Sequence, residues 1–281
     1  MSPSTLDRPT PVGVVAEPRG RKWRDVMVHA RRNLIHVGRD PTQLADVTIQ
    51  PLMFTLLFIY VFGAGIPIPG GSYKDYALPG LLVLNLTTAT IGTAVGLSTD
   101  LHGGVVDRFR TLPMWPAAVL VGRSIADALS AVVCVCIVGL TGFLIGWRPD
   151  AGMASVLAGF GIALLFSYAL TWASTCVGLL AKGPESAQAL GLVVLFPLGL
   201  VSDAMVPTQG MPGWLLAFTN WNPVSAVASA CRELFGNPNP ATSIDAWPMQ
   251  HPVAAALGWS AVLLLVFAPL ASVLYRRRTT G

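Results

Sequence analysis

The stretch LPGLLVLNLTTATIGTAVGLST, residues 78–99, contains no charged side chain from end to end. About 20 apolar residues are enough for a helix to cross the hydrocarbon core of a bilayer, which is about 30 Å thick. Every backbone N–H and C=O in lipid must be bonded within the protein, and a helix meets that requirement by itself. The stretch therefore predicts a membrane-spanning helix.

The rest of the chain has the same character. Hydrophobic residues make up 53% of the 281 positions and charged residues only 11%, whereas soluble domains carry about 25% charged residues. Further spans are predicted at about 48–66, 117–146, 152–181, 187–206 and 253–275. No run of short alternating strands, as a membrane barrel needs, is present. The fold class expected is an all-α polytopic membrane protein with six transmembrane helices in a single domain, residues 21–281.

The basic residues set the orientation. With the N-terminus in the cytoplasm, fifteen of the eighteen Lys and Arg residues fall on the cytoplasmic side, as the positive-inside rule requires. Lys74, Arg148 and Arg232 are the exceptions. We therefore expect both termini in the cytoplasm.

Three segments outside the spans have distinct patterns. Residues 1–20 are rich in proline and are expected to be a disordered cytoplasmic tail. Residues 21–41, RKWRDVMVHARRNLIHVGRDP, place apolar residues at helical spacing between arginines, which favours an amphipathic helix on the membrane surface. The alternative is a solvated basic flank that only sets topology. The external stretch 203–250 contains three tryptophans and predicts short re-entrant or interfacial helices.

The sequence lacks the common catalytic, nucleotide-binding and metal-binding motifs. It has no GxxxxGK[ST] phosphate loop, no GxSxG, no HExxH and no CxxC. We expect no catalytic residue, no metal site and no cofactor bound by this chain, which argues against an enzyme.

One ionisable residue could indicate ion coupling. Asp127 lies in the third predicted span, where a buried carboxylate would mark a proton or sodium path. Arg123 precedes it by one helical turn, so the plainer interpretation, which we favour, is an ion pair near the membrane interface.

The second span offers candidate residues for a substrate pathway. Asn85, Thr88 and Gly92 share one helix face, and Gly92 with Gly96 forms a GxxxG motif that lets helices approach closely. Such a face is expected to meet another helix, a second subunit or a passage. The alternative is internal packing with the hydroxyls bonded back to their own helix.

The first span adds an aromatic stripe. Phe54, Phe58 and Phe62 recur every fourth residue and so lie on one helix face. They are candidates for contact with an apolar substrate, although such stripes more often meet lipid or a partner helix.

Between the second and third spans lies the charged sequence VVDRFRTLP, residues 105–113, within the cytoplasmic loop 100–116. Asp107, Arg108 and Arg110 have no catalytic partner nearby. They either enforce topology or form a docking surface, and the other basic segments already enforce topology.

The order of QPLMF, DRFRTLP, MPGW and WNPV along the chain resembles that of the ABC type-2 transporter permeases, above all the daunorubicin-resistance permeases of actinobacteria. The resemblance implies six helices per subunit, two facing permease subunits (two copies of this chain or a pair with a related permease) and a separate ATPase below each. It places the protein in the bacterial plasma membrane. ATP and magnesium would be bound by the ATPase, not by this chain.

The resemblance also implies roles for segments. Residues 21–41 would be the connecting helix, and the pieces between 207 and 236 the outer re-entrant helices. The coupling helix that contacts the ATPase would include the following residues of the loop: Asp107, Arg108, Phe109, Arg110 and Leu112.

The function expected is thus that of the membrane-spanning permease subunit of an ATP-driven exporter for a hydrophobic or amphipathic compound, either a drug such as an anthracycline or a lipid. The alternatives are an ion-coupled secondary transporter and a non-transport membrane assembly protein. Dependence on an ATPase rather than on the proton gradient separates the first two, and a stable complex with an ATPase argues against the third.

Overall fold

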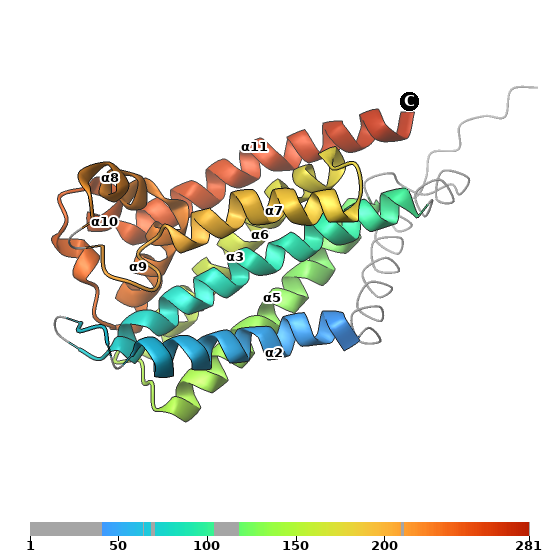
Figure 1. Cartoon of the computed structure of the whole chain (residues 1–281). Helices are drawn as coiled ribbons and strands as arrows, with labels where there is room; N and C mark the ends of the chain where they lie inside the picture. The colour runs from blue at the N-terminus through green and yellow to red at the C-terminus, as the bar shows by residue number, and fades with distance from the viewer. Residues whose placement is uncertain (1–40, 64, 69–70, 104–117, 209–210, 281) are drawn as a thin grey trace, which may run out of the picture.

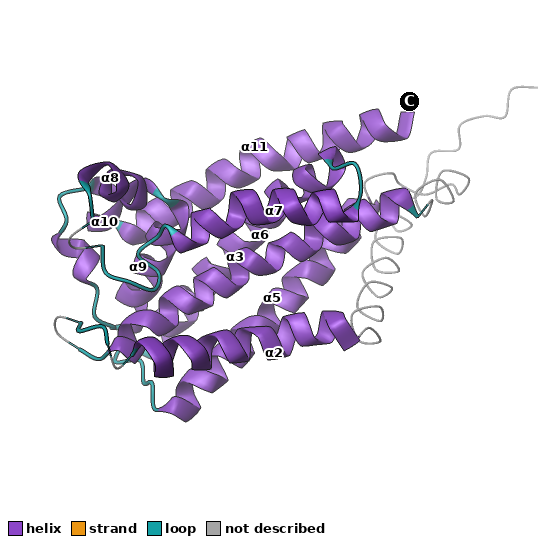
Figure 2. Cartoon of the chain, viewed as in Figure 1, coloured by secondary structure: helices purple, strands orange, loops and turns teal. Residues whose placement is uncertain are grey.

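The computed structural model of the chain describes residues 41–63, 65–68, 71–103, 118–208 and 211–280. Within these ranges the chain forms helices joined by short connections, without any strand (Figure 2). The elements are α2 (Pro41–Leu57), the π-helical segment η1 (Phe58–Phe62), α3 (Tyr73–His102), α5 (Ala118–Ile145), α6 (Met153–Leu180), α7 (Pro184–Leu200), α8 (Gly213–Trp221), α9 (Pro223–Phe235), the short 3-10 helix η2 (Pro240–Ser243), α10 (Trp247–Gln250) and α11 (Pro252–Thr280). The all-helical fold class is confirmed.

Four helical stretches are long and apolar enough to cross a membrane: Tyr73–His102, Leu120–Ile145, Met153–Leu180 and Pro252–Arg278. The shortest of them has 26 residues, or about 39 Å at 1.5 Å per residue, more than the hydrocarbon core of about 30 Å. Two shorter apolar helical stretches, Thr48–Phe62 and Pro184–Leu200, accompany them.

The observed bounds differ from the predicted ones where polar residues lie at helix ends. α3 begins at Tyr73, earlier than predicted, because Ser72 caps the helix and accepts a hydrogen bond from the backbone N–H of Asp75 at 3.4 Å. The prediction of a helix as far as residue 206 was wrong, since α7 ends at Leu200 and residues 201–206 form turns. Pro197 lies in the last turn of α7, and the side-chain amide of Asn222 donates to the carbonyls of Leu198 and Val201, both at 2.7 Å.

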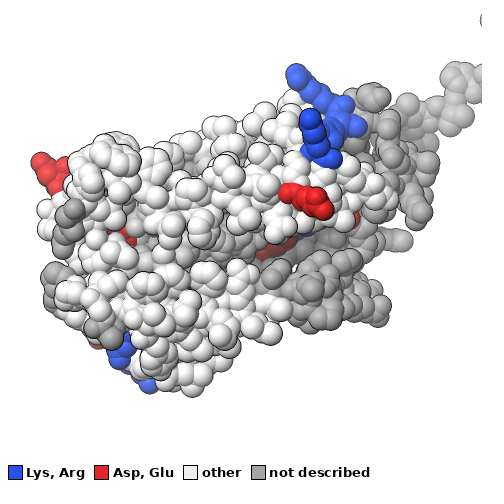
Figure 3. All heavy atoms as spheres, in the orientation of Figure 1, with Lys and Arg blue, Asp and Glu red and all other residues white. Residues whose placement is uncertain are grey.

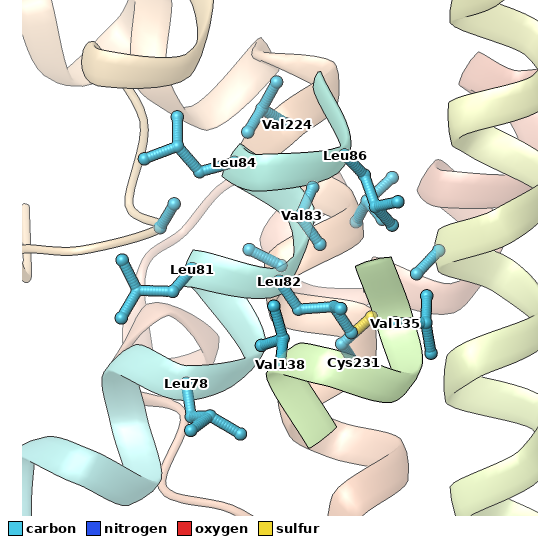
Figure 4. Packing of buried hydrophobic residues seen from close by; sticks show 14 of the residues in the cluster. Leu78, Leu81, Leu82, Val83, Leu84, Leu86, Val135, Val138, Val224 and Cys231 are labelled. Atoms are coloured by element: carbon cyan, nitrogen blue, oxygen red, sulfur yellow. The ribbon is translucent and has the colours of Figure 1, made fainter. Parts of the chain in front are cut away.

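α3 runs through the middle of the bundle, where it contacts α5, α6, α7 and α9 (Figure 1). Its buried side chains begin the main hydrophobic core. In Figure 4, Leu82 lies beside Val138 of α5 and Cys231 of α9. Gly178 of α6 allows the closest approach to α3, because a Cβ there would lie 2.6 Å from the carbonyl oxygen of Ala94. α11, by contrast, leaves most of its apolar surface exposed.

The bundle has two distinct ends. α8, α9 and α10 gather at one end, which we call the α9 end (Figure 1). The C-terminus, the turn between α6 and α7 and the last turns of α3 lie at the other end, the C-terminal end. Charged side chains gather towards both ends, and the middle of the face seen in Figure 3 is largely uncharged. This distribution is the one expected of a bundle whose middle lies in lipid.

Candidate functional site

Two predicted segments lie outside the described residues. These are the amphipathic helix, apart from its last residue, and the charged loop with Asp107, Arg108, Phe109, Arg110 and Leu112. Pro41, expected to end the amphipathic helix, is the first residue of α2. The roles predicted for these segments stay predictions.

The aromatic stripe on α2 is a stacked column. The rings of Phe54 and Phe58 lie 5.9 Å apart at 28°, and those of Phe58 and Phe62 lie 5.0 Å apart at 16°. The column continues into η1, where the helix widens to the π form. Phe58 packs against the hydrophobic core, whereas Phe62 is 42% exposed. The column thus reaches from the core of the bundle to its surface at the α9 end.

The three α3 candidates do not form one open surface. Asn85 is buried, and its amide donates to the carbonyl oxygen of Leu81 at 2.9 Å. Thr88 is half-buried, and its hydroxyl lies 3.0 Å from the carbonyl oxygen of Leu84. Gly92 is exposed. The hydroxyl and amide donors are therefore bonded back to their own helix, which leaves a neutral open surface of Thr88 and Gly92.

The two glycines of the GxxxG motif have different surroundings within the described part of the chain. A Cβ on Gly92 would have no atom within 4 Å among the described residues, while a Cβ on Gly96 would collide with the guanidinium of Arg123. Gly96 therefore makes room for an arginine rather than for a helix backbone. Close contact of this motif with a second subunit stays a prediction.

Arg123 is the centre of a charged group, the Arg123 cluster, which joins α3 to α5 near the C-terminal end. Its Nη1 lies 3.1 Å from Oδ2 of Asp100 on α3, and its Nε lies 3.9 Å from Oδ2 of Asp127 on α5. Thr93 of α3 donates to the same Asp127 oxygen at 2.9 Å. The predicted pair with Asp127 is thus present, but the shorter contact is with Asp100. The sequence did contain a sign of the Asp100–Arg123 contact, because these two residues flank the same short loop.

A second charged group, the Arg232 pair, is buried at the α9 end. Nη1 of Arg232 on α9 lies 2.9 Å from Oδ2 of Asp203, and both side chains are at most 2% exposed. Its Nη2 donates to the carbonyls of Asp203 and Ala204, at 2.7 and 3.0 Å, and its Nε to the carbonyl of Tyr76 at 2.9 Å. The guanidinium lies 3.9 Å from the centre of the Tyr76 ring. The pair therefore ties α9, the turns after α7 and the first turn of α3 together.

Sequence reasoning missed the Arg232 pair. It placed Arg232 and Asp203 in the outer stretch 203–250 but did not connect them, because no spacing rule relates a residue of a helix to a residue of the turns 29 positions before it. The available signal was an arginine in an apolar helix: Val227, Cys231 and Phe235 of α9 are buried, and a charge at such a position calls for a partner.

α8 presents aromatic rings at the same end. Trp214, Phe218 and Trp221 are 75%, 52% and 59% exposed, and their spacing places them on one side of the helix. Tryptophan is enriched at the headgroup level of membranes. Among the described residues no group of three or more His, Cys, Asp or Glu side chains is arranged to hold a metal ion.

Comparison with known proteins gives a consistent result. Residues 24–235 match the family described as ABC-2 type transporter. A daunorubicin resistance ABC transporter permease protein of Streptomyces coeruleorubidus is 34% identical, over 99% of this chain and 98% of that protein. A doxorubicin resistance ABC transporter permease protein of Mycobacterium tuberculosis is 26% identical, over 73% of this chain and 70% of that protein.

Proposed function

Because the chain belongs to the ABC-2 type transporter family and is the membrane subunit of an ABC exporter, we propose that it moves a hydrophobic or amphipathic compound out of the cell. The observation that carries the proposal is the match to a daunorubicin resistance permease along nearly the whole chain. Anthracyclines are therefore the first substrates to test, and an amphipathic lipid is the second.

We propose that energy comes from a separate ATPase subunit. The 281 residues contain no phosphate loop, so hydrolysis needs a partner. ATP and magnesium would be bound there. A second permease subunit, either another copy of this chain or a related permease, would complete the pathway.

Residues 21–281 would form one permease domain with six spans in the plasma membrane. α2 with η1 has 17 and 5 residues, about 33 Å of helix, enough to cross the core. α7 has 17 residues, about 26 Å, and the turns that follow it would complete the crossing. The C-terminal end would face the cytoplasm, since Arg276, Arg277 and Arg278 lie there. The exposed aromatic face of α8 supports an interfacial position of the stretch 203–250.

The coupling element would be the loop 100–116, with Asp107, Arg108, Phe109, Arg110 and Leu112 docking on the ATPase. The loop connects α3 to α5, and the Arg123 cluster ties these two helices together directly beside it. A push on the loop would therefore move α3 and α5 as a unit. This arrangement supports a transmission role for the loop.

The pathway would use the Phe54–Phe58–Phe62 column and the open α3 surface of Thr88 and Gly92, with Asn85 behind it. The residues of both surfaces are uncharged, although Nη2 of Arg123 donates to the carbonyl of Gly92 at 3.5 Å, and the donors of Asn85 and Thr88 are bonded within α3. Such a surface suits a large apolar or amphipathic molecule better than a heavily hydrated one.

The test is ATP-driven uptake of doxorubicin into inside-out vesicles that contain the chain and its ATPase. We expect uptake to require ATP and to persist when an uncoupler collapses the proton gradient. Uptake that follows the proton gradient instead would favour the ion-coupled alternative. Asp107→Ala and Arg108→Ala should leave the protein in the membrane but reduce drug-stimulated ATP hydrolysis, and unchanged coupling in both variants would contradict the docking role.

A further inference from the structure

A polar hollow at the α9 end has no part in the proposed pathway. It has a volume of about 260 Å³ and lies between the first turn of α3, the connection from α5 to α6 and the residues after α9. Its lining includes Lys74, Asp75, Arg148, Asp150 and Asn237. It therefore combines two cations, two carboxylates and an amide in one recess.

The two cations of the hollow bond to backbone carbonyls and not to carboxylates. Nζ of Lys74 donates to the carbonyl of Gly146 at 3.0 Å. Nη1 of Arg148 donates to the carbonyls of Phe143 and Trp147, and its guanidinium lies 3.7 Å from the centre of the Phe143 ring. Within the described part of the chain neither cation lies within 4.0 Å of a carboxylate. Neither cation is thus engaged in an ion pair with a described residue, although two carboxylates line the same hollow.

The acceptors in the hollow are also unused. The carboxylate of Asp150 makes no hydrogen bond or ion pair with a described residue, and Oδ1 of Asn237 is enclosed without a hydrogen bond to any of them. Asp75 accepts a hydrogen bond from the hydroxyl of Ser72 and has further acceptor capacity. A ligand that carries both an anionic and an ammonium group could bond to the cations of the hollow and to its free acceptors at the same time.

The position of the hollow points to a lipid. Lys74 is in the first turn of α3 and Arg148 follows the last turn of α5, so both lie where predicted spans end. Directly before Arg148, α5 exposes Leu140, Phe143 and Leu144, at 61%, 53% and 76%. Figure 3 shows basic atoms at this end, apart from the larger basic group near the C-terminus. With Arg232 buried in its ion pair, Lys74 and Arg148 are the two remaining basic residues predicted on the outer side, and both line one recess.

We propose that this hollow binds the headgroup of a phosphatidylethanolamine molecule of the outer leaflet. Lys74 and Arg148 hold the phosphate, as cationic donors do. Asp150 and Asp75 accept from the ammonium group, and the acyl chains lie along the exposed apolar residues of α5. The assignment to the outer leaflet rests on the proposed orientation, while the binding itself does not require the chain to export anything.

Thermal unfolding of the purified, lipid-depleted full chain in detergent tests the proposal. The probes are phosphatidylethanolamine, diacylglycerol with the same acyl chains, and inorganic phosphate. We expect phosphatidylethanolamine alone to raise the midpoint temperature. Lys74→Gln with Arg148→Gln should weaken its apparent affinity by about tenfold for each cation removed, because a tenfold change corresponds to about 1.4 kcal/mol, the size of one hydrogen bond to a charged group.

Lys182→Gln is the matched control, since it removes an exposed cation at the opposite end of the bundle. It should keep the full lipid response. Should the double variant fold poorly, Arg148→Gln alone serves, because the hydrogen bonds of Arg148 within the described residues are to carbonyls of the nearby Phe143 and Trp147.

Three results would overturn the proposal: an equal response to diacylglycerol, which means apolar contact alone; an equal response to inorganic phosphate, which means a free-anion site; or an undiminished lipid response in the double variant. None of these measurements involves ATP or an ATPase. A failure of the lipid site is therefore distinguishable from a failure of the proposed export function.

Discussion

The two arginine-centred groups of this bundle differ in nearly every physical respect. The Arg232 pair is at most 2% exposed, and each of three guanidinium nitrogens donates to an acceptor within 3.0 Å. In the Arg123 cluster the side chains are 16% and 24% exposed, and Nε of Arg123 has no hydrogen-bond partner in the described part of the chain. Arg232 is enclosed and makes four hydrogen bonds, although Oδ1 of Asp203 has no hydrogen-bond partner among the described residues, whereas Arg123 is partly exposed and makes fewer close contacts.

The difference indicates which end of the molecule is fixed. A buried ion pair is costly to separate, because each partner would be left unpaired in a medium of low dielectric constant. A partly exposed pair exchanges protein for water contacts at little cost. We expect the α9 end to remain one rigid body, and the C-terminal end to be the part that moves, with α3 and α5 shifting together against the other helices.

The largest effect is expected for Arg232→Ala. It leaves Asp203 buried without its partner, which should lower the free energy of unfolding by about 3–5 kcal/mol. Chemical denaturation of the detergent-purified protein measures this, with Arg148→Ala as the exposed control. A double replacement, Arg232→Met with Asp203→Leu, should recover most of the loss, since it removes both charges. A loss below about 1 kcal/mol for Arg232→Ala, the value typical of an exposed pair, would show that the pair is no anchor.

A smaller effect on stability is expected for Arg123→Ala, about 1 kcal/mol or less, because its partners are partly exposed. Its effect on function should be larger than its effect on stability, since α3 and α5 would no longer move together. Drug-stimulated ATP hydrolysis should fall while drug-free hydrolysis is kept. If Arg123→Ala destabilised the protein as much as Arg232→Ala, the two ends would not differ as we describe.

Smaller still is the difference between two glycine replacements on α3. Gly92→Ala adds a methyl group in open space and should stabilise the helix by about 0.5–1 kcal/mol. Gly96→Ala should lose this gain, because its Cβ displaces the guanidinium of Arg123. Thermal unfolding compares them. In an Arg123→Ala background, Gly92→Ala and Gly96→Ala should change the stability by the same amount. A difference that persists there would show that another neighbour, and not Arg123, destabilises Gly96→Ala.

The smallest effect is expected in the chemical reactivity of Cys231, which lies beside Arg232 and reports whether the α9 end is closed. Burial raises the pKa of this thiol to about 12, so at pH 8 only about one molecule in ten thousand carries the reactive thiolate. We expect no maleimide labelling of Cys231 in the folded protein at pH 8, and labelling in Arg232→Ala, where the α9 end loosens. The urea-unfolded protein is the control for full reactivity. Rapid labelling of Cys231 in the unaltered protein would contradict a closed α9 end.

The sequence was sufficient for the long helices and insufficient for what joins them. Apolar runs predicted 152–181 and 253–275, and the helices are Met153–Leu180 and Pro252–Thr280. A membrane-spanning helix depends on the hydrophobicity of neighbouring residues, so it can be recognised from one continuous segment of the sequence. The error at residues 201–206 has the opposite cause: the run ends in turns whose bonding partners, Asn222 and Arg232, are distant in the sequence.

The candidate pathway residues were also predicted only in part. Helical spacing predicted that Phe54, Phe58 and Phe62 share a face, and their rings stack. Spacing also placed Asn85 with Thr88 and Gly92, but their exposure differs, because α3 is enclosed by several helices at Asn85 and open at Gly92. Such exposure depends on neighbours that are distant in the sequence.

The order of the Arg232 pair along the chain has a consequence for biosynthesis. Tyr76 and Asp203 are translated before Arg232, so the acceptors that surround its guanidinium leave the ribosome first. In the proposed orientation α9 is delivered to the outer side of the membrane, where its arginine would meet a carboxylate and carbonyls that are already there. α11, which contacts α9, is translated last. The α9 end can therefore assemble in the order of synthesis, with no unpaired arginine waiting for a partner.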